Sequence, residues 1–138
     1  MKTLFFPLLL LSSTVIFAQN TQIQLSFQKD YPDARDVRWN QTNNQWHGTY
    51  RDRDNRDVNV YYDQYGNRVD THIPWDRRQV PPDVDHRIER RYHVNEYRVE
   101  RIERPSYRPL FQIRIGTRSR PVYMDEDGRK RRYHDRHD

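Results

Sequence analysis

The segment VNVYYDQYGNRV, residues 58–69, has the pattern of two strands joined by a tight turn. Apolar and polar side chains alternate along the first strand, with Val58, Val60 and Tyr62 at every second position. The DQYG tetrapeptide that follows ends in Gly66, and glycine readily adopts the positive φ that many turns require. The segment therefore predicts an antiparallel hairpin with one buried face.

A second segment of the same pattern, RPVYMDEDGRKR, covers residues 120–131. Asp63 and Gly66 of the first segment recur there as Asp125 and Gly128, both at a shift of 62 positions. Self-similarity at one fixed spacing is the sequence signature of a repeated structural unit. The chain is therefore predicted to contain a duplicated unit.

Two helical patterns precede these hairpins at nearly the same spacing. In residues 21–31 apolar side chains recur every four positions, at Ile23, Phe27 and Tyr31. In residues 82–92 the same spacing recurs at Val84, Ile88 and Tyr92. We expect the first helix to begin at a capping box on Thr21 and to end before Pro32. Each helix is followed by three or four alternating stretches, which predict antiparallel strands, with a bulge at Ile102 where the alternation breaks.

The first 18 residues have the pattern of a secretory leader. Lys2 precedes a short apolar run, and the small residue Ala18 ends it. Pro7 and the polar SST triplet interrupt the run, which makes it too short for a membrane span. We expect cleavage near Ala18, a periplasmic or secreted location and no membrane span.

Composition predicts one domain of about 120 residues with a small, aromatic-rich core. The chain has 25 basic and 20 acidic side chains, no cysteine, ten tyrosines and three tryptophans. Without cysteine, disulfide bonds and thiolate metal sites are excluded. Aromatic side chains bury roughly 150–250 Å² each and can replace the scarce aliphatic ones. Residues 134–138 lack an apolar period and are predicted to form a disordered tail.

Several segments resemble exported PepSY-like proteins, a family described as similar to the beta-lactamase-inhibitor protein and common in Bacteroidetes-type bacteria. The resemblance is carried by FQKDYPDARDVRW (27–39), YYDQYGN (61–67) and IPWDRRQVP (73–81), and it extends over about residues 22–133. His93 departs from the family pattern because proline is expected there.

The resemblance implies an α+β fold of two tandem repeats, residues 19–75 and 76–133. Each repeat would be one helix packed on three to four antiparallel strands, and together they would form one curved sheet with the helices on one face. The resemblance implies no catalysis. In the inhibitor relatives the concave face of the sheet grips a protein.

The residues themselves give no support for an enzyme, and no cofactor is expected. The serines stand in no nucleophile motif and there is no cysteine. No metal site is predicted, because three groups of metal-binding side chains are better interpreted as solvated surface residues. These groups are Asp52, Asp54 and Asp57; Asp125, Glu126 and Asp127; and His134 and His137. Nucleic acid is an unlikely partner because basic and acidic residues alternate, as in RDRDNRD, residues 51–57.

We therefore expect a non-enzymatic exported binding module that recognises or masks an envelope protein or peptide through its sheet face. Tyrosine, tryptophan and arginine are the residues that protein interfaces favour. The alternative is electrostatic binding of an anionic glycan or lipopolysaccharide by the basic run at residues 129–132. The aromatic candidates could equally serve as core residues. Candidate partner-binding residues are Trp46, Tyr50, Tyr97, Tyr107, Arg129, Lys130, Arg131 and Arg132.

Overall fold

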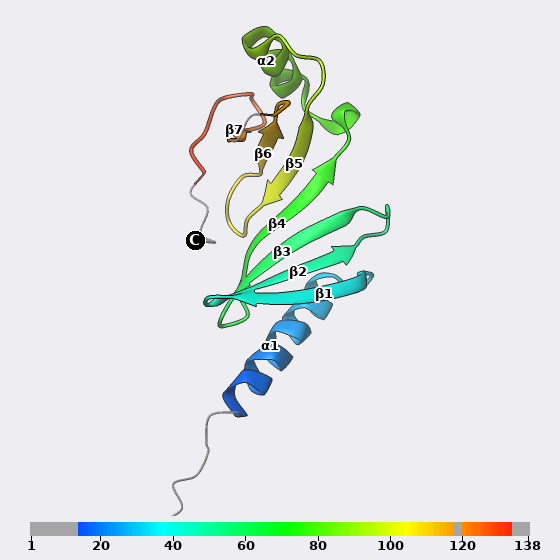
Figure 1. Ribbon diagram of the computed structural model, residues 1–138, viewed down its shortest axis with the longest axis vertical. Helices are drawn as coiled ribbons and strands as arrows, with labels where there is room; N and C mark the ends of the chain where they lie inside the picture. Colours follow the sequence, from blue (N-terminus) through cyan, green and yellow to red (C-terminus); the bar gives the residue numbers. More distant parts are fainter. Residues whose placement is uncertain (1–13, 118–119, 134–138) are drawn as a thin grey trace, which may run out of the picture.

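The computed structural model describes residues 14–117 and 120–133, with side chains from Thr21 onward. This part of the chain contains two α-helices, one short 3-10 helix and seven strands (Figure 1). In chain order they are α1 (Thr14–Asp30), β1 (Arg35–Thr42), β2 (Gln45–Arg51), β3 (Asp57–Asp63), β4 (Arg68–Trp75), η1 (Arg77–Gln79), α2 (Pro82–Tyr92), β5 (Arg98–Glu103), β6 (Leu110–Arg114) and β7 (Val122–Met124).

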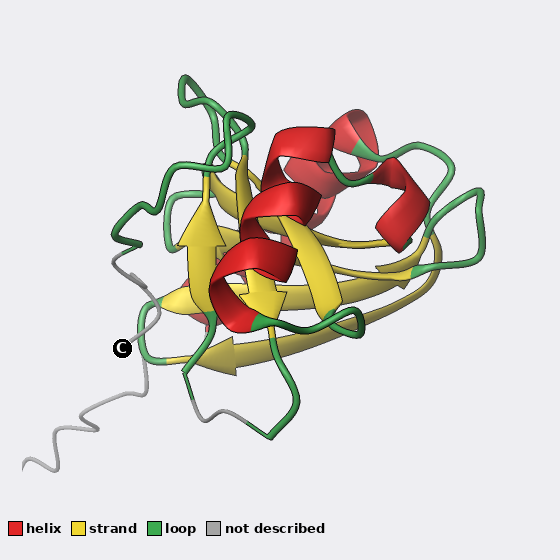
Figure 2. Ribbon diagram, turned by 90° about the horizontal axis from the view of Figure 1, so that it is seen from above, coloured by secondary structure: helices red, strands yellow, loops and turns green. Residues whose placement is uncertain are grey.

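The seven strands form one antiparallel sheet whose order follows the chain, from β1 at one edge to β7 at the other. The chain passes from β4 to β5 through η1 and α2, and these two strands also pair antiparallel. Seen from above, strands from the two ends of the sheet cross, so the sheet is strongly twisted (Figure 2). The α+β class and the antiparallel sheet that the sequence predicts are confirmed.

Helix α1 is longer than predicted. It begins at Thr14 and not at Thr21, so the expected capping box lies inside the helix. Residues 14–20 contain no glycine or proline, so nothing in them interrupts helical hydrogen bonding. The C-terminal boundary is confirmed, because α1 ends at Asp30, two residues before Pro32.

The first hydrophobic cluster lies between α1 and strands β2 and β3. The ring of Phe27 contacts both Trp39 and Tyr50 edge-on, with ring centres 5.2 Å apart in each pair. The helical stripe of α1 thus meets the alternating apolar side chains of the sheet, as the sequence predicts. The buried members of this first cluster are Ile23, Phe27, Trp46, Tyr50, Val58, Val60 and Tyr62.

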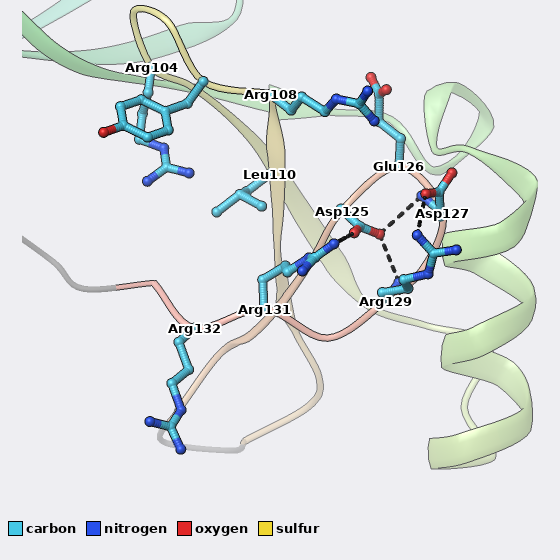
Figure 3. A pocket seen from close by; sticks show the side chains of 10 residues that line it. Arg104, Arg108, Leu110, Asp125, Glu126, Asp127, Arg129, Arg131 and Arg132 are labelled. Carbon is cyan, nitrogen blue, oxygen red and sulfur yellow. Dashed lines mark hydrogen bonds and ion pairs between the residues drawn. The ribbon is translucent and has the colours of Figure 1, made fainter.

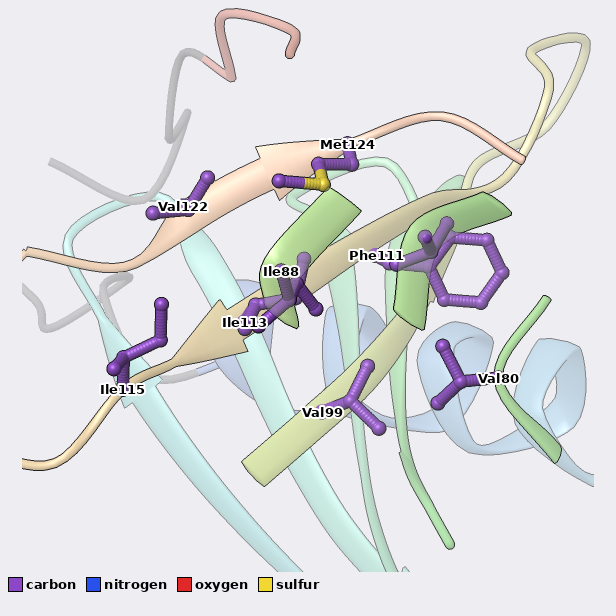
Figure 4. Close-up of a cluster of buried hydrophobic side chains, with 9 residues drawn as sticks. Val80, Ile88, Val99, Phe111, Ile113, Ile115, Val122 and Met124 are labelled. Carbon is purple, nitrogen blue, oxygen red and sulfur yellow. The ribbon is translucent and has the colours of Figure 1, made fainter. Parts of the chain in front are cut away.

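The second cluster lies between α2 and strands β5, β6 and β7 (Figure 4). Pro82 occupies the first turn of α2, where its missing N–H costs nothing. Trp75 at the end of β4 packs beside this cluster, with its ring centre 5.5 Å from that of Phe111. The buried members are Val80, Val84, Ile88, Val99, Phe111, Ile113, Ile115, Val122 and Met124.

The prediction of a bulge at Ile102 is wrong. Strand β5 pairs without a register shift from Glu103, opposite Thr71, to Val99, opposite Trp75. Val99 and Ile102 are both buried, although three positions separate them and they point to opposite faces of the strand. The apolar alternation breaks because both faces of β5 are covered at this point.

Some predicted features lie wholly or partly outside the described residues. Residues 1–13 of the predicted leader and residues 134–138 of the predicted tail, with His134 and His137, belong to this group. In the part that the structure describes, no helix is long and apolar enough to cross a membrane.

Candidate functional site

Side chains that alternate with the core residues form a polar face on the sheet. His47 follows the buried Trp46 and pairs with Tyr61 on β3, while His72 on β4 pairs with Asn59, two residues from Tyr61. The same register continues through β5 and β6 to β7. We call this set the polar face: His47, Asn59, Tyr61, His72, Glu100, Gln112 and Tyr123.

Aromatic rings of the polar face contact one another from β2 to the C-terminal segment. His47 and Tyr61 stack with ring centres 4.7 Å apart and planes inclined by 8°. Tyr61 meets His72 edge-on at 5.3 Å, and Tyr133 stacks on Tyr123 at 4.8 Å. These contacts hold the rings in fixed orientations, so little conformational freedom remains to be lost when a partner binds.

A hydrogen-bonded row continues the array across the remaining strands. Glu100 Oε2 lies 3.6 Å from His72 Nδ1 and accepts a 3.2 Å hydrogen bond from Gln112 Nε2. Tyr123 in turn donates from its hydroxyl to Gln112 Oε1 at 3.1 Å. The contact with the His72 side chain lowers the pKa of Glu100, and it outweighs the opposing effect of burial. Glu100 is therefore a carboxylate at neutral pH.

The C-terminal segment lies across one end of the polar face. The Tyr133 hydroxyl donates a 2.6 Å hydrogen bond to Asp70 Oδ2 and lies 3.5 Å from His72 Nε2. Before it, the backbone N–H of Arg131 donates to the carbonyl of Tyr123 at 2.8 Å. Tyr133 is therefore a member of the array, although it follows the last strand.

A buried carboxylate organises the turn after β7. Asp125 Oδ1 accepts the backbone N–H of Arg129 at 2.9 Å and that of Asp127 at 3.1 Å, and Oδ2 accepts Arg131 Nε at 2.8 Å. Burial acts to raise the pKa of Asp125, but the hydrogen bonds from the Arg129 backbone and the Arg131 side chain outweigh it and lower the pKa. The charged form of Asp125 thus stabilises the turn.

We expect the stability of the protein to fall as pH drops below about 4. Asp125, Asp85 and Asp52 all have a lowered pKa in the folded state, because hydrogen bonds from arginines outweigh the effect of burial. The unfolded chain therefore takes up protons first, and the stability present above the unfolded pKa is lost as pH falls through the folded pKa. Urea unfolding between pH 7 and pH 3 measures this. Asp125→Asn should flatten the acid limb, and a stability unchanged down to pH 3 would contradict the prediction.

An arginine cleft of about 320 Å³ lies between the β5–β6 connection and the segment after β7 (Figure 3). Leu110 lies between Arg104 and the Asp125–Arg131 pair. The lining combines five cationic and three acidic side chains with an apolar floor. It is formed by Arg104, Tyr107, Arg108, Leu110, Asp125, Glu126, Asp127, Arg129, Arg131 and Arg132.

Two of the aromatic candidates are core residues. Trp46 and Tyr50 are 7% and 5% exposed and belong to the cluster under α1. Their positions alternate with the outward-facing His47, so they occupy the buried side of β2. Of the two roles that the sequence leaves open for them, the structure places both in the core, so they are not available to a partner on an exposed face. Burial also raises the pKa of the Tyr50 hydroxyl.

The other two aromatic candidates are not members of the polar face. The Tyr97 hydroxyl donates to Asp85 Oδ1 at 2.6 Å, and the guanidinium of Arg77 lies 5.4 Å from the centre of the Tyr97 ring. Tyr97 therefore ties the start of β5 to α2. Tyr107 is 62% exposed in the β5–β6 connection and lines the arginine cleft.

The basic run at residues 129–132 is exposed but partly neutralised. Arg129 pairs with Asp127 at 3.0 Å, and Arg131 pairs with Asp125 at 2.6 Å. No ion pair of Lys130 or Arg132 is found with another described residue. Half of the run is therefore engaged within its own turn.

Within the described residues, no group of three or more metal-binding side chains is close enough to hold an ion. The Asp52 carboxylate accepts a 2.8 Å hydrogen bond from Arg56 Nε, and Asp54 Oδ2 lies 3.1 Å from Arg56 Nη2. The loop between β2 and β3 is thus held by an arginine.

The polar face contains residues that the sequence analysis did not single out. His47, Tyr61 and His72 each stand next to an apolar or aromatic residue, and the apolar pattern of the sequence marks those neighbours instead. The available signal was the alternation itself, because each residue beside an inward position of a strand points outward. The assignment of Glu100, Gln112 and Tyr123 to the polar face requires the register of strand pairing, which the sequence does not reveal.

Comparison with known proteins finds relatives in structure alone. No protein-family model and no curated protein matches the chain. A proposed periplasmic protein from Bacteroides eggerthii is 18% identical with a TM-score of 0.72, over 80% of this chain and 84% of its own. A DUF2874 family protein from Bacteroides uniformis is 19% identical with a TM-score of 0.72, covering 80% and 85%.

A third structure, a BLIP-like protein from Bacteroides fragilis, is 21% identical with a TM-score of 0.71 and covers 86% of both chains. The chain has a BLIP-like fold. The resemblance to exported proteins similar to the beta-lactamase-inhibitor protein is therefore confirmed in structure. At this level of identity, the BLIP-like fold is what the two proteins share.

Proposed function

We propose that this protein is a non-enzymatic, exported binding module that holds an envelope protein or peptide on the polar face of its sheet. The continuous array of rings and hydrogen-bonding groups from His47 to Tyr133 carries the proposal. Such an array offers apolar area and directional polar contacts together, as the centres of protein interfaces do. The partner would be masked sterically, without a cofactor.

The BLIP-like fold supports a protein partner, since the resemblance to the inhibitor family implies that a sheet face grips a protein. The leader pattern in residues 1–18, with a cut near Ala18, supports export. One structural neighbour is itself a proposed periplasmic protein. Tyr107 and the side chains of residues 129–132 would contribute to the polar rim of the interface.

We also propose that the chain is a tandem duplication of residues 19–75 and 76–133, with a short tail after it. The two turns support this, because Asp63 and Asp125 make equivalent backbone hydrogen bonds. The N–H of Gly66 donates to the carbonyl of Asp63 at 3.1 Å, and that of Gly128 to the carbonyl of Asp125 at 3.0 Å. The pairing of Tyr62 with Arg68 likewise has its counterpart in the bridge from Met124 to Lys130.

Both helices would cover one face of the sheet, and the polar face would lie on the other side. Ile73 on β4 packs beside the cluster under α1, while Trp75, two residues later, packs beside the cluster under α2. Residues two apart on a strand point to the same side. This supports a layout in which one face is used for folding and the other for binding.

The test is capture from envelope extract with the chain from Gln19 onward as bait, washed at low and moderate salt. We expect one protein to be retained at both salt concentrations, and Tyr61→Ala to weaken its binding at least about tenfold. Tyr65→Ala is the matched control, because Tyr65 is an exposed tyrosine of the same hairpin but lies in its turn. Binding that Tyr61→Ala leaves unchanged would exclude the polar face.

The alternative, electrostatic binding of an anionic glycan or lipopolysaccharide by residues 129–132, has less support. Arg129 and Arg131 are already paired with acids of their own turn. This alternative predicts that all binding is lost between low and moderate salt, because exposed charges are screened. An interface centred on aromatic rings should largely persist there.

A further inference from the structure

We propose that the arginine cleft is a binding site for a small oxyanion, a carboxylate or phosphate group, centred on Arg104. This site does not depend on the polar face binding a protein. Its central residue follows β5 directly and is not part of the basic run at residues 129–132. The cleft volume of about 320 Å³ suits a ligand the size of a sugar acid or a phosphate ester.

The guanidinium of Arg104 lies over two tyrosine rings. Its central carbon is 4.9 Å from the ring centre of Tyr107 and 5.7 Å from that of Tyr133. Cation–π contacts of this kind use the face of the flat guanidinium and do not consume the N–H groups at its edge. Forked N–H groups of this kind match the spacing of two oxygens in a carboxylate or phosphate.

Arg104 also has hydrogen-bonding capacity that the protein does not use. Its Nε is buried and has no hydrogen-bond partner, and no ion pair joins its side chain to another described residue. A buried donor without a partner is unfavourable, so the protein leaves part of the hydrogen-bonding capacity of Arg104 unused. A second hollow of about 210 Å³ shares Arg104 and Tyr107, so the stack faces open space on more than one side.

The remaining charges of the cleft favour an anion. Asp125 and Asp127 are already paired with Arg131 and Arg129. Arg108 and Arg132 are exposed and, among the described residues, have no ion-pair partner. Glu126 is the one acid of the lining that no described cation neutralises. The free charges therefore leave a net excess of positive charge around Arg104.

The test measures binding of two probes, inorganic phosphate and glucuronate, by NMR shifts of the Arg104 Nε–H group and the Tyr107 and Arg108 amides. Titrations run at about 0.15 M ionic strength, where exposed charges beyond about 8 Å are screened, and glucose serves as the neutral probe. We expect saturable shifts with at least one anion and none with glucose. Saturation by phosphate alone or by glucuronate alone would assign the site to that group.

Arg104→Gln should weaken binding at least about tenfold, the loss expected for a charge-assisted hydrogen bond. If this variant fails to fold, Arg108→Gln tests the same cleft from its exposed rim and should weaken binding several-fold. Arg38→Gln is the matched control, because Arg38 is exposed on β1 at the opposite edge of the sheet. Absence of saturable shifts, or equal weakening by the control variant, would overturn the proposal.

Discussion

Replacing Tyr62 with alanine is expected to lower the free energy of unfolding by about 4 kcal/mol. Tyr62 is fully buried between α1 and the sheet, and its ring centre lies 6.1 Å from that of Trp39. Its hydroxyl donates to Asp30 Oδ2 at 3.1 Å, so the side chain also anchors the end of α1. The alanine variant removes the ring, leaves a cavity and deletes this hydrogen bond.

Urea unfolding of Tyr62→Ala, Tyr62→Phe and Tyr65→Ala separates these contributions. Tyr62→Phe keeps the ring and should cost about 1 kcal/mol for the lost hydrogen bond. Tyr65 is 66% exposed, so Tyr65→Ala should change stability by less than about 0.5 kcal/mol. If Tyr62→Ala cost no more than Tyr65→Ala, the cluster under α1 would not be a core.

The two glycine turns should respond unequally to the same substitution. Gly128 and Gly66 have φ values of 70° and 81°, which strain any other residue. A Cβ atom at Gly128 would lie 2.6 Å from the backbone carbonyl oxygen of Asp83, in the first turn of α2. At Gly66 the nearest atom, 3.3 Å away, belongs to the flexible side chain of Gln22. The second turn therefore has a rigid neighbour and the first has an adaptable one.

We expect Gly128→Ala to destabilise the protein by about 3 kcal/mol and Gly66→Ala by about 1 kcal/mol. The excess in the first variant comes from the displacement of α2. Denaturant unfolding of both variants measures the two losses of unfolding free energy. Amide hydrogen exchange shows where protection is lost, which should be in α2 and β7 for Gly128→Ala. Equal costs would mean that the turn after β7 does not pack against α2.

Local patterns predicted most of the secondary structure. The stripe in residues 82–92 predicted α2 with its buried residues Val84 and Ile88, and the DQYG turn predicted the β3–β4 hairpin. Tyr62 was expected in the core, and it is. These features depend on periodicity and backbone preference, which neighbouring residues determine.

The candidate site was less predictable because exposure depends on the whole sheet. Trp46 and His47 are adjacent, yet the first is buried under α1 and the second stacks on Tyr61. Trp46 is the more conspicuous candidate in the sequence, although alternation assigns the outward position to its neighbour His47. Arg104 and Arg108 carried no motif at all.

The sequence by itself determined the helix of residues 82–92, the hairpin turns and the α+β class, since these follow from spacing and turn chemistry within a few residues. Only the tertiary structure decided the rest. Strand register joins His72, Glu100 and Gln112 into one row. The fold-back after β7 brings Tyr133 beside Arg104. These residues lie far apart in the chain, and no local preference encodes which distant strands meet or at which offset.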